Sequence, residues 1–336
     1  MTALAVVIVA YDSVRDLPGT LAALRPQLAD GDELLIVDNA SSDDPSGVVG
    51  DARVLRLERN LGFAGGCNAG AAATTAPLLF FLNPDARPAQ GCLDALRAAA
   101  DAHPGWGAWQ ALVALPGGDA VNTRGGEVHW LGVGWSGGYG EPVATLAGDD
   151  RAVGFALGAA LVVRRGAWDA AGGFDPGYFM YGEDLDLSLR LRLAGWEIGL
   201  ARAAAVEHDY EFAKGEQKWF LLERNRWTTV LGAYPRPLLA ALLPALLLAE
   251  LAFVAVAARG GWLGAKLRAQ AAVLRELPSM LRRRAAVQAA STVSASEFAG
   301  ALTASLENPF LGTVAEVRPL AAAQAAYWRL VRSALP

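Results

Sequence analysis

The sequence predicts an α/β fold in which helices cover both faces of a mostly parallel β-sheet, followed by a helical, membrane-associated C-terminal region. In the first third of the chain, short apolar runs alternate with Ala- and Leu-rich amphipathic stretches, the pattern of a parallel sheet. Polar and acidic motifs follow several of these runs directly, at the strand ends where ligands of such sheets gather. Further on, the segment 238–258 is almost entirely apolar.

The alternation predicts the following elements in chain order. Strands are expected at 4–9, 33–37, 54–57 and 78–82. Helices are expected at 17–29, 46–51, 63–75 and 91–102. The Gly- and Trp-rich part at 105–150 suggests irregular or antiparallel structure, and the run at 153–163 suggests a strand that enters a helix. Apolar residues alternate at 184–194 as in a strand, but the leucine-rich composition and the acidic first turn favour a helix that starts near Glu183.

Charge and cysteine content narrow the class of protein. The formal net charge is −5, which argues against a nucleic-acid binder with a broad basic surface. From Leu251 onward the chain carries ten Arg or Lys and four Glu, a net +6, which leaves −11 for the rest. An acidic body with a basic tail suggests docking on an anionic surface. Cys67 and Cys92 have no paired spacing, and the N-terminus lacks a basic leader, which fits a reducing cytoplasm.

The apolar segment 238–258 has two possible interpretations. As a helix it would rise about 30 Å, enough to cross a bilayer. However, Pro244 would kink it and Glu250 would be costly in lipid. A membrane-embedded or membrane-spanning helix and a buried core helix therefore both stay open. The cations that follow, between 266 and 284, would lie on the cytoplasmic side of a membrane by the positive-inside rule.

The motif with the most chemistry runs from Phe174 to Asp186 and holds three carboxylates within four residues, Glu183, Asp184 and Asp186. Acidic residues in a first helical turn are common as caps and dipole partners. Alternatively, one of them is a general base, because crowded like charges raise a carboxyl pKa. The aromatic walls of such a cleft would be Phe179, Tyr181 and Trp196.

Three further motifs follow strands. Asn83-Pro84-Asp85 can hold a divalent cation against a diphosphate, or it is simply a turn. The glycine-rich stretch 59–70 allows close backbone approach, and the helix that it opens would present free N–H groups to an anion. It lacks the P-loop and dinucleotide spacings, and a tight turn with close helix packing explains it equally well. Asp38 and Asn39 could pair with the edge of a pyrimidine base, or cap a helix.

Two other features carry weaker signals. His208 is either a structural histidine or a metal ligand. The basic cluster Lys214, Lys218, Arg224 and Arg226 could face a diphosphate or membrane phosphates, or form a solvated helix face.

Taken in order, these motifs are specific as a set: Ala-Tyr after the first strand, Val-Asp-Asn-Ala-Ser-Ser-Asp, Asn-x-Gly-Phe-Ala-x-Gly-x-Asn-x-Gly, Leu-Asn-Pro-Asp and Tyr-x-Glu-Asp-x-Asp. The set closely resembles family 2 glycosyltransferases of the Rossmann-like GT-A fold, in particular their rhamnosyltransferase-like branch. The likeness covers about 2–234. It implies a GT-A domain at 1–234, with a nucleotide-binding half at 1–104 and an acceptor and catalytic half at 105–234, followed by a membrane-associated tail at 235–336.

The resemblance also implies roles for individual residues. Asp184 would be the catalytic base, supported by Glu183 and Asp186. Asp85 would bind Mg²⁺ or Mn²⁺ together with the donor diphosphate, and His208 would be a further metal or diphosphate contact. The residues implied around the nucleotide sugar are Tyr11, Asp38, Asn39, Arg59, Asn60, Gly66, Asn68 and Asp85. Asn83 replaces the first Asp of the family's Asp-x-Asp motif, a form that the rhamnosyltransferase-like branch shares, and this leaves fewer charged metal ligands.

The implied reaction is an inverting sugar transfer in the synthesis of cell-envelope polysaccharide, at the cytoplasmic face of the plasma membrane. The expected donor is dTDP-rhamnose, with a UDP- or GDP-hexose as the alternative, and the expected acceptor is a saccharide on a polyprenyl diphosphate. A non-catalytic sugar-nucleotide-binding protein of the same fold is the second alternative. A nucleotidyltransferase would need a basic Gly-rich loop after the first strand, where this chain has Tyr11-Asp12-Ser13. The enzyme hypothesis requires Asp85 and Asp184 to converge on one cleft.

Overall fold

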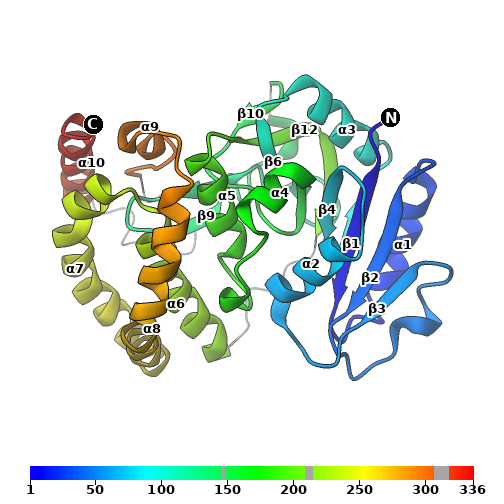
Figure 1. The fold of residues 1–336 in the computed structure, drawn as a ribbon, viewed down its shortest axis with the longest axis horizontal. Coiled ribbons are helices and arrows are strands. Elements are labelled where there is room, and N and C mark those ends of the chain that lie inside the picture. The colour runs from blue at the N-terminus through cyan, green and yellow to red at the C-terminus, as the bar shows by residue number, and fades with distance from the viewer. Residues whose placement is uncertain (146–147, 209–214, 306–317) are drawn as a thin grey trace. The chain divides into compact units, whose positions relative to one another are not determined.

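The computed structural model describes residues 1–145, 148–208, 215–305 and 318–336 (Figure 1). Contacts along the chain divide it into two compact units, which are described separately. The first unit comprises 1–126, 136–191 and 196–210, and the second comprises 127–135, 192–195 and 211–336. The second unit thus takes in the helix before residue 234 as well as the tail, and the sequence-based division at residue 234 stays a prediction about the organisation of the chain.

The first unit is built on one large mixed sheet, in the order β10-β12-β6-β11-β4-β1-β2-β3. The strands of this sheet are β1 Leu4–Ala10, β2 Glu33–Asp38, β3 Arg53–Arg56, β4 Leu78–Leu82, β5 Ala86–Pro88, β6 Trp106–Ala114, β7 Val121–Thr123, β10 Arg151–Ala152, β11 Ala160–Arg164 and β12 Glu197–His208. Strands β8 Gly126–Val128 and β9 Gly134–Ser136 form a separate two-stranded sheet. Strands β3, β2, β1 and β4 are all parallel. Strand β11 runs antiparallel to both β4 and β6, and β12 runs parallel to β6.

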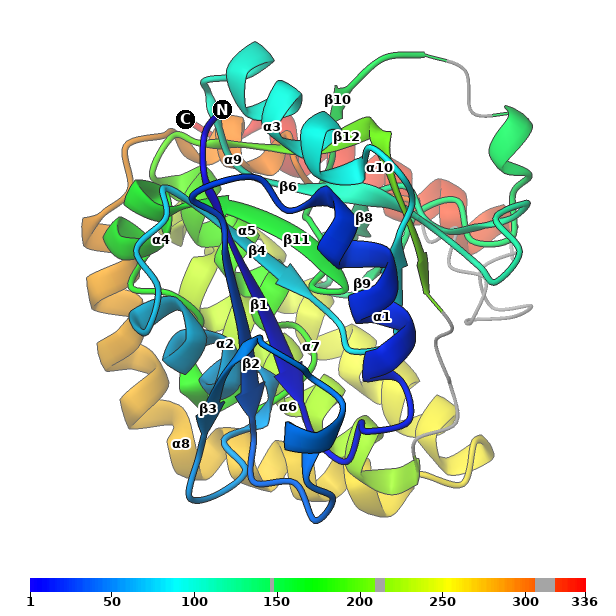
Figure 2. The same ribbon diagram turned by 90° about the vertical axis from the view of Figure 1, so that its right-hand side faces the viewer.

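The helices described are α1 Leu17–Leu24, α2 Gly62–Ala72, α3 Cys92–Ala102, α4 Arg165–Ala171, α5 Glu183–Leu193, α6 Gly215–Ala233, α7 Arg236–Arg259, α8 Leu263–Ala289, α9 Ala295–Ala299 and α10 Arg318–Ser333. Helices α1 and α3 pack on one face of the sheet, and α2, α4 and α5 on the other (Figure 2). Successive residues of β1 show why, since Val6 belongs to the first of these cores and Val7 to the second. Such a strand is apolar on both sides, as in other buried parallel sheets. The predicted α/β fold with helices on both faces is confirmed.

Three of the predicted elements differ from the structure. The helix expected at 46–51 is only a 3₁₀ turn, Pro45–Gly47, whose N-terminal Asp44 accepts a hydrogen bond from Ser46 N. The part at 105–150 contains the expected antiparallel pairing, of β6 with β11 and β7. It differs in that β6 is a fully buried nine-residue strand that also runs parallel to β12. In the run 153–163, only the last residues form the strand β11, and its helix, α4, starts after the run at Arg165.

The predicted helix near Glu183 is confirmed as α5. Its five leucines are all buried, at positions 185, 187, 189, 191 and 193. A helix that is buried on several faces need not show a single apolar stripe. This explains why leucines at every second position imitated a strand.

The second unit is helical, and α7 is its most apolar element. Among the parts of the chain that the structure describes, α7 is the one helix whose length and composition would allow it to cross a membrane. One side of it packs on protein, because Leu238, Leu242 and Leu246 are fully buried. Helices α6 and α8 form the most extensive helix pair of the unit.

Candidate active site

The first group of candidate residues lies at the carboxyl ends of β1 and β2. These strands are parallel neighbours, so the residues after them meet at one edge of the sheet, where Asn39 N donates to Ala10 O at 2.8 Å. Tyr11 is half exposed, as a residue that stacks on a base must be. Asp38 is buried, with Oδ1 accepting from Ser41 N at 2.9 Å and Oδ2 lying 3.0 Å from Arg56 Nε. Its carboxylate therefore already has protein partners.

Asn39 and Asn60 hold the glycine-rich loop onto this edge. The Asn39 side-chain amide donates to Asn60 Oδ1 at 3.0 Å, and its Oδ1 accepts from Leu61 N at 2.9 Å. Asn60 Oδ1 also accepts from Gly62 N at 2.8 Å. Arg59, next to this pair, is exposed. The two asparagines therefore position the loop, and the side chain of their neighbour Arg59 is exposed to solvent.

Helix α2 begins with two of its N–H groups, those of Gly62 and Ala64, already occupied by protein acceptors. Gly62 N bonds to Asn60, and Ala64 N donates to the Phe179 carbonyl at 3.2 Å. Gly62 has a φ of +71°, and a Cβ there would lie 2.1 Å from Phe179 O. The turn therefore requires glycine so that the segment around Phe179 can approach the helix.

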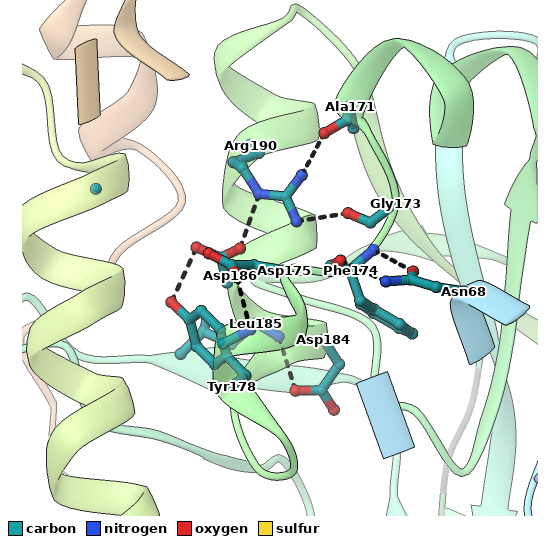
Figure 3. Close-up of polar contacts among 12 residues, drawn as sticks. Asn68, Ala171, Gly173, Phe174, Asp175, Tyr178, Asp184, Leu185, Asp186 and Arg190 are labelled. Carbon is teal, nitrogen blue, oxygen red and sulfur yellow. Dashed lines mark hydrogen bonds and ion pairs between the residues drawn. The ribbon is translucent and has the colours of Figure 1, made fainter. Parts of the chain in front are cut away.

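Gly66 and Asn68 face protein neighbours rather than an open pocket. A Cβ on Gly66 would lie 2.6 Å from Val9 Cγ1, so this glycine allows α2 to approach β1 closely. Asn68 donates to Phe174 O at 2.8 Å and accepts from Phe174 N at 3.0 Å (Figure 3). These contacts explain both residues as packing and loop-holding groups, and a role in donor binding stays a prediction.

Asp85 and His208 converge at the end of β4. Strand β5 brings them together, because Ala86 pairs with His208 on β12. His208 Nε2 lies 3.1 Å from Asp85 Oδ1 and 3.2 Å from the Asn83 amide nitrogen. His208 is buried, whereas the Asp85 side chain keeps 36% of its surface exposed. One ring nitrogen and one carboxylate oxygen therefore lie side by side next to a partly exposed side chain, although the two residues are 123 positions apart.

Asp184 lies at the start of α5 and is tied to the same end of the sheet. Its Oδ2 accepts from Gly158 N at 3.0 Å, and its Oδ1 accepts from Leu185 N at 2.7 Å. The residue after Gly158 is Ala159, whose carbonyl accepts from Asn83 N at 3.0 Å. Two consecutive residues therefore connect the Asp184 carboxylate to the Asn-Pro-Asp turn. The convergence of Asp85 and Asp184 on one cleft stays a prediction.

Glu183 and Asp184 are adjacent carboxyl groups whose pKa values are raised to different extents. Burial raises the pKa of Glu183 well above the usual range, and the neighbouring Asp184 charge adds to this. Glu183 is 5% exposed, and its Oε2 has no hydrogen-bond partner. Burial also raises the pKa of Asp184, but the bonds from Gly158 N and Leu185 N oppose it. Glu183 therefore keeps its proton to higher pH, and Asp184 is the member that ionises, a division typical of paired catalytic carboxyls.

The contacts of Asp186, the third carboxylate of the motif, hold the loop before α5 and the helix together (Figure 3). Asp186 is fully buried, accepts from Tyr178 OH at 3.0 Å and pairs with Arg190 Nε at 2.8 Å. Arg190 also donates to the carbonyls of Ala171 and Gly173, at 2.7 and 2.8 Å. Sequence reasoning overlooked Arg190, although its spacing of four from Asp186 on a helix is a signal for an ion pair.

The predicted aromatic walls fit only in part. Phe179 and Tyr181, in the loop before α5, have positive φ values of 63° and 70°, and strain of this kind concentrates at functional sites. Trp196 follows the other end of α5, about 13 Å along the helix axis from Asp184, and it packs against Gly107. Trp196 therefore lies away from the Asp184 carboxylate. Phe63 does lie there, since a Cβ on Gly158 would contact both Phe63 and Asp184.

The basic cluster does not form one surface. Lys214 lies outside the described residues. Arg226 is buried and bonds to Leu131 O and to Glu250 within the second unit. Arg224 donates to Asn225. The prediction that Arg226 faces a phosphate or solvent is therefore wrong, because its side chain is buried in an ion pair.

Two family models match the chain. The model of glycosyl transferase family 2 matches residues 5–147, and that of glycosyl transferase family group 2 matches 79–295. An N-acetylglucosaminyl-diphospho-decaprenol L-rhamnosyltransferase of Mycobacterium tuberculosis is 32% identical over 245 residues, which cover 63% of this chain and 78% of that protein. The rhamnosyltransferase WbbL of Escherichia coli is 37% identical over 78 residues, 23% of this chain and 28% of that protein.

Solved structures share the fold at low sequence identity. GalNAc-T7 with UDP, GalNAc and Mn²⁺ aligns with a TM-score of 0.55 and 15% identity over 70% of this chain, which spans about half (49%) of that protein. Residues 1–349 of S. aureus TarS in complex with UDP align with a TM-score of 0.52 and 17% identity, covering 98% of this chain and 90% of that one.

Proposed function

The chain belongs to glycosyl transferase family 2, and from this premise we propose that it is an inverting rhamnosyltransferase that uses dTDP-rhamnose and a polyprenyl-diphosphate-linked saccharide. The chain is thus a glycosyltransferase. The identities of its sugar donor and its acceptor are what we propose. The donor sugar and the type of acceptor are supported by the relative from M. tuberculosis, named for rhamnosyl transfer to N-acetylglucosaminyl-diphospho-decaprenol. A cytoplasmic membrane face is the matching location, because such a lipid acceptor stays in the membrane.

The observation that carries the mechanism is the connection of two carboxylates to one edge of the sheet. Asp184 is fixed by Gly158 N, and Asp85 belongs to the turn that bonds to Ala159. Asp184 would remove the proton from the acceptor hydroxyl, whose oxygen then attacks the anomeric carbon from the face opposite the leaving diphosphate. A single displacement of this kind inverts the configuration at that carbon.

The residues present fit a divalent cation with two protein ligands. Asp85 Oδ1 and His208 Nε2 lie side by side, and oxygen and nitrogen donors of this kind suit Mn²⁺ or Mg²⁺. In the described part of the chain, no group of three or more His, Cys, Asp or Glu side chains could hold a metal. Diphosphate oxygens would therefore complete the coordination. The cation would neutralise charge on the departing nucleoside diphosphate.

For the nucleotide, we propose that Tyr11 stacks on the base and that Arg59 contacts the ribose or phosphates. Tyr11 is half exposed and Arg59 is exposed, whereas Asp38, Asn39 and Asn60 bond to protein groups and would shape the base pocket from behind. A UDP- or GDP-hexose is the alternative donor. Which of these donors the enzyme uses depends on the edge of the nucleotide base that this pocket accepts.

The test is a transfer assay with dTDP-rhamnose, UDP-hexoses and GDP-hexoses, each with Mn²⁺ and a polyprenyl-diphosphate-linked N-acetylglucosamine acceptor. Transfer from dTDP-rhamnose with inverted anomeric configuration in the NMR spectrum of the product is expected. Transfer only from a UDP- or GDP-hexose would replace the proposed donor. Nucleotide binding without transfer from any donor would favour a non-catalytic binding protein.

A further inference from the structure

Helix α7 has one face on protein and one face in solvent, and its solvent face is apolar. Its exposed positions follow each other at helical spacing, and all of those between the terminal arginines are Ala, Leu or Pro: 237, 240, 243, 244, 247, 248, 251, 252, 255 and 258. Leu248 and Leu251 are 69% and 70% exposed. Exposed apolar stripes of this length are unusual on soluble proteins and mark interaction surfaces.

The protein-facing side of α7 is fixed by ion pairs, which decides how the helix can meet a membrane. Glu250 bonds to Lys266 Nζ at 2.7 Å and to Gln270 Nε2 at 2.8 Å, both on α8. It also pairs with Arg226 on α6. Lys266 is completely buried. A helix that crossed the bilayer alone would expose Glu250 to lipid and leave Lys266 without this partner, so the contacts disfavour a lone span.

Helix α8 repeats the pattern with added charge. Exposed apolar positions recur at spacings of three and four, at 264, 267, 271, 274, 278, 281 and 285. An exposed arginine follows each of the three leucines of this row, Arg268, Arg275 and Arg282. Arg268 and Arg275 each pair with a carboxylate at the surface, but exposed pairs of this kind are weak and give way to stronger anions. Leucines beside arginines are typical of helices that lie at a membrane surface.

From these observations we propose that α7 lies half-embedded in the cytoplasmic interface of an anionic membrane, parallel to its plane, and does not cross it. The leucines of the exposed stripe enter the lipid, and Glu250 stays on the protein side. The arginines Arg236 and Arg259, at the two ends of α7, and those of α8 contact lipid phosphates. The inference deepens the proposed membrane location and does not depend on the sugar that is transferred.

The occupant of this surface is a membrane rather than a second copy of the chain. Three of the exposed positions of α8, Gly264, Ala271 and Pro278, are too small or too irregular for the knobs of a coiled coil. In addition, Arg268, Arg275 and Arg282 would face like charges or neutral residues in a parallel pair of α8 helices. Anionic phosphates complement the same arginines.

The first test separates a half-embedded helix from a crossing one. Single cysteines replace Arg236 and Arg259 at the two ends of α7, and the native Cys67 and Cys92 are buried. A membrane-impermeant maleimide should label neither position in intact cells and both positions in inside-out membrane vesicles. Labelling of exactly one of the two ends in intact cells would show a crossing helix and overturn the proposal.

The second test asks whether the stripe binds lipid. The double variant Leu247→Glu/Leu251→Glu should bind vesicles of phosphatidylcholine and phosphatidylglycerol about 100-fold more weakly than the wild type in sedimentation, because two leucine side chains leave the lipid. The control Gln90→Glu/Ala98→Glu places the same charges on exposed positions of the first unit and should bind as the wild type does. Equal binding by both variants would overturn the proposal.

A third comparison identifies the source of the anions. Binding to phosphatidylcholine alone should be weaker than to the anionic mixture, and circular dichroism should show the same helix content in both double variants. Dimerisation of the wild type without vesicles, abolished by Leu247→Glu/Leu251→Glu, would assign the stripe to a second copy of the chain instead. None of these measurements needs a sugar donor, so loss of the proposed rhamnosyl transfer would leave them unchanged.

Discussion

Gly158 N donates a 3.0 Å hydrogen bond to Oδ2 of Asp184. Through the next residue, Ala159, the same short segment holds Asn83 of the Asn-Pro-Asp turn. The carboxylate proposed as the base and the turn proposed to carry the metal are thus held by the two residues that precede β11. Fixed positions of this kind would favour catalysis, because the reacting groups then need less ordering.

The first prediction concerns Asp184 as the base. Asp184→Asn keeps the size of the side chain and removes the charge that accepts the proton, so kcat should fall at least about 100-fold. Titration calorimetry with dTDP should give a nucleotide Kd close to that of the wild type. Asp169→Asn, at an exposed position of α4, serves as the control with unchanged kcat. Normal turnover of Asp184→Asn would remove this residue from the mechanism.

The second prediction concerns the metal. His208→Ala removes the nitrogen ligand next to Asp85, so Mn²⁺ affinity measured in the presence of dTDP should fall about 10- to 100-fold. Chelation of divalent cations should abolish transfer by the wild type. His103→Ala is the matched control, because His103 pairs with Asp150 at the end of α3, away from this turn. Equal Mn²⁺ affinities for the two variants would contradict the proposed ligand.

The third prediction is a dependence of stability on pH. Burial raises the folded-state pKa of Glu183 above its unfolded value, so the folded state binds the proton more tightly. This stabilisation is present below the unfolded pKa and is lost as the pH rises toward the folded pKa. Glu183→Gln carries no such proton and should therefore melt about 2–4 °C higher than the wild type near pH 8. The difference should shrink near pH 4, and an equal difference at both pH values would contradict the assignment.

Much of the fold follows from the sequence because buried parallel strands are apolar runs with few alternatives. The helix over Glu183 and the motif order that places Asp85 and Asp184 at strand ends are of this kind. Strands β6 and β12 were not foreseen, since their alanines and glycines carry little strand preference and gain it only from their neighbours. Gly158 was missed for a different reason, because only the fold brings it to its partner Asp184, 26 positions along the chain. Arg190 was overlooked although its spacing of four from Asp186 was readable in the sequence.

The fourth prediction compares two glycines. Gly62→Ala would place a Cβ 2.1 Å from Phe179 O at a φ of +71°, so the loop before α5 must move away from α2. We expect a loss of stability of about 1–3 kcal/mol together with a lower kcat, because this loop precedes Asp184. Gly166→Ala meets no atom within 4 Å and lies inside α4, so it should be neutral or stabilise by up to about 1 kcal/mol. Denaturant unfolding and initial rates measure both effects, and identical behaviour of the two variants would show that the Phe179 contact is unimportant.

The fifth prediction concerns the ion pairs beneath α7. Burial works to raise the pKa of Glu250, but Arg226 and Lys266 lower it below its ordinary value of 4.5. Its stabilising effect is therefore present above that value and is lost as the pH falls through the folded pKa. Glu250→Gln leaves Lys266, which is fully buried, with Glu223 as its remaining carboxylate partner. The variant should lose about 3–5 kcal/mol of unfolding free energy at pH 7, and the loss should diminish in acid. Glu250→Gln leaves two cations, Lys266 and Arg226, to share Glu223. Adding Lys266→Met removes this excess positive charge and should restore much of the stability in denaturant unfolding. If the double variant were as unstable as Glu250→Gln, the loss of unfolding free energy would come from packing and not from the buried charge. The ion pairs would then not be the contacts that hold α7 to α8.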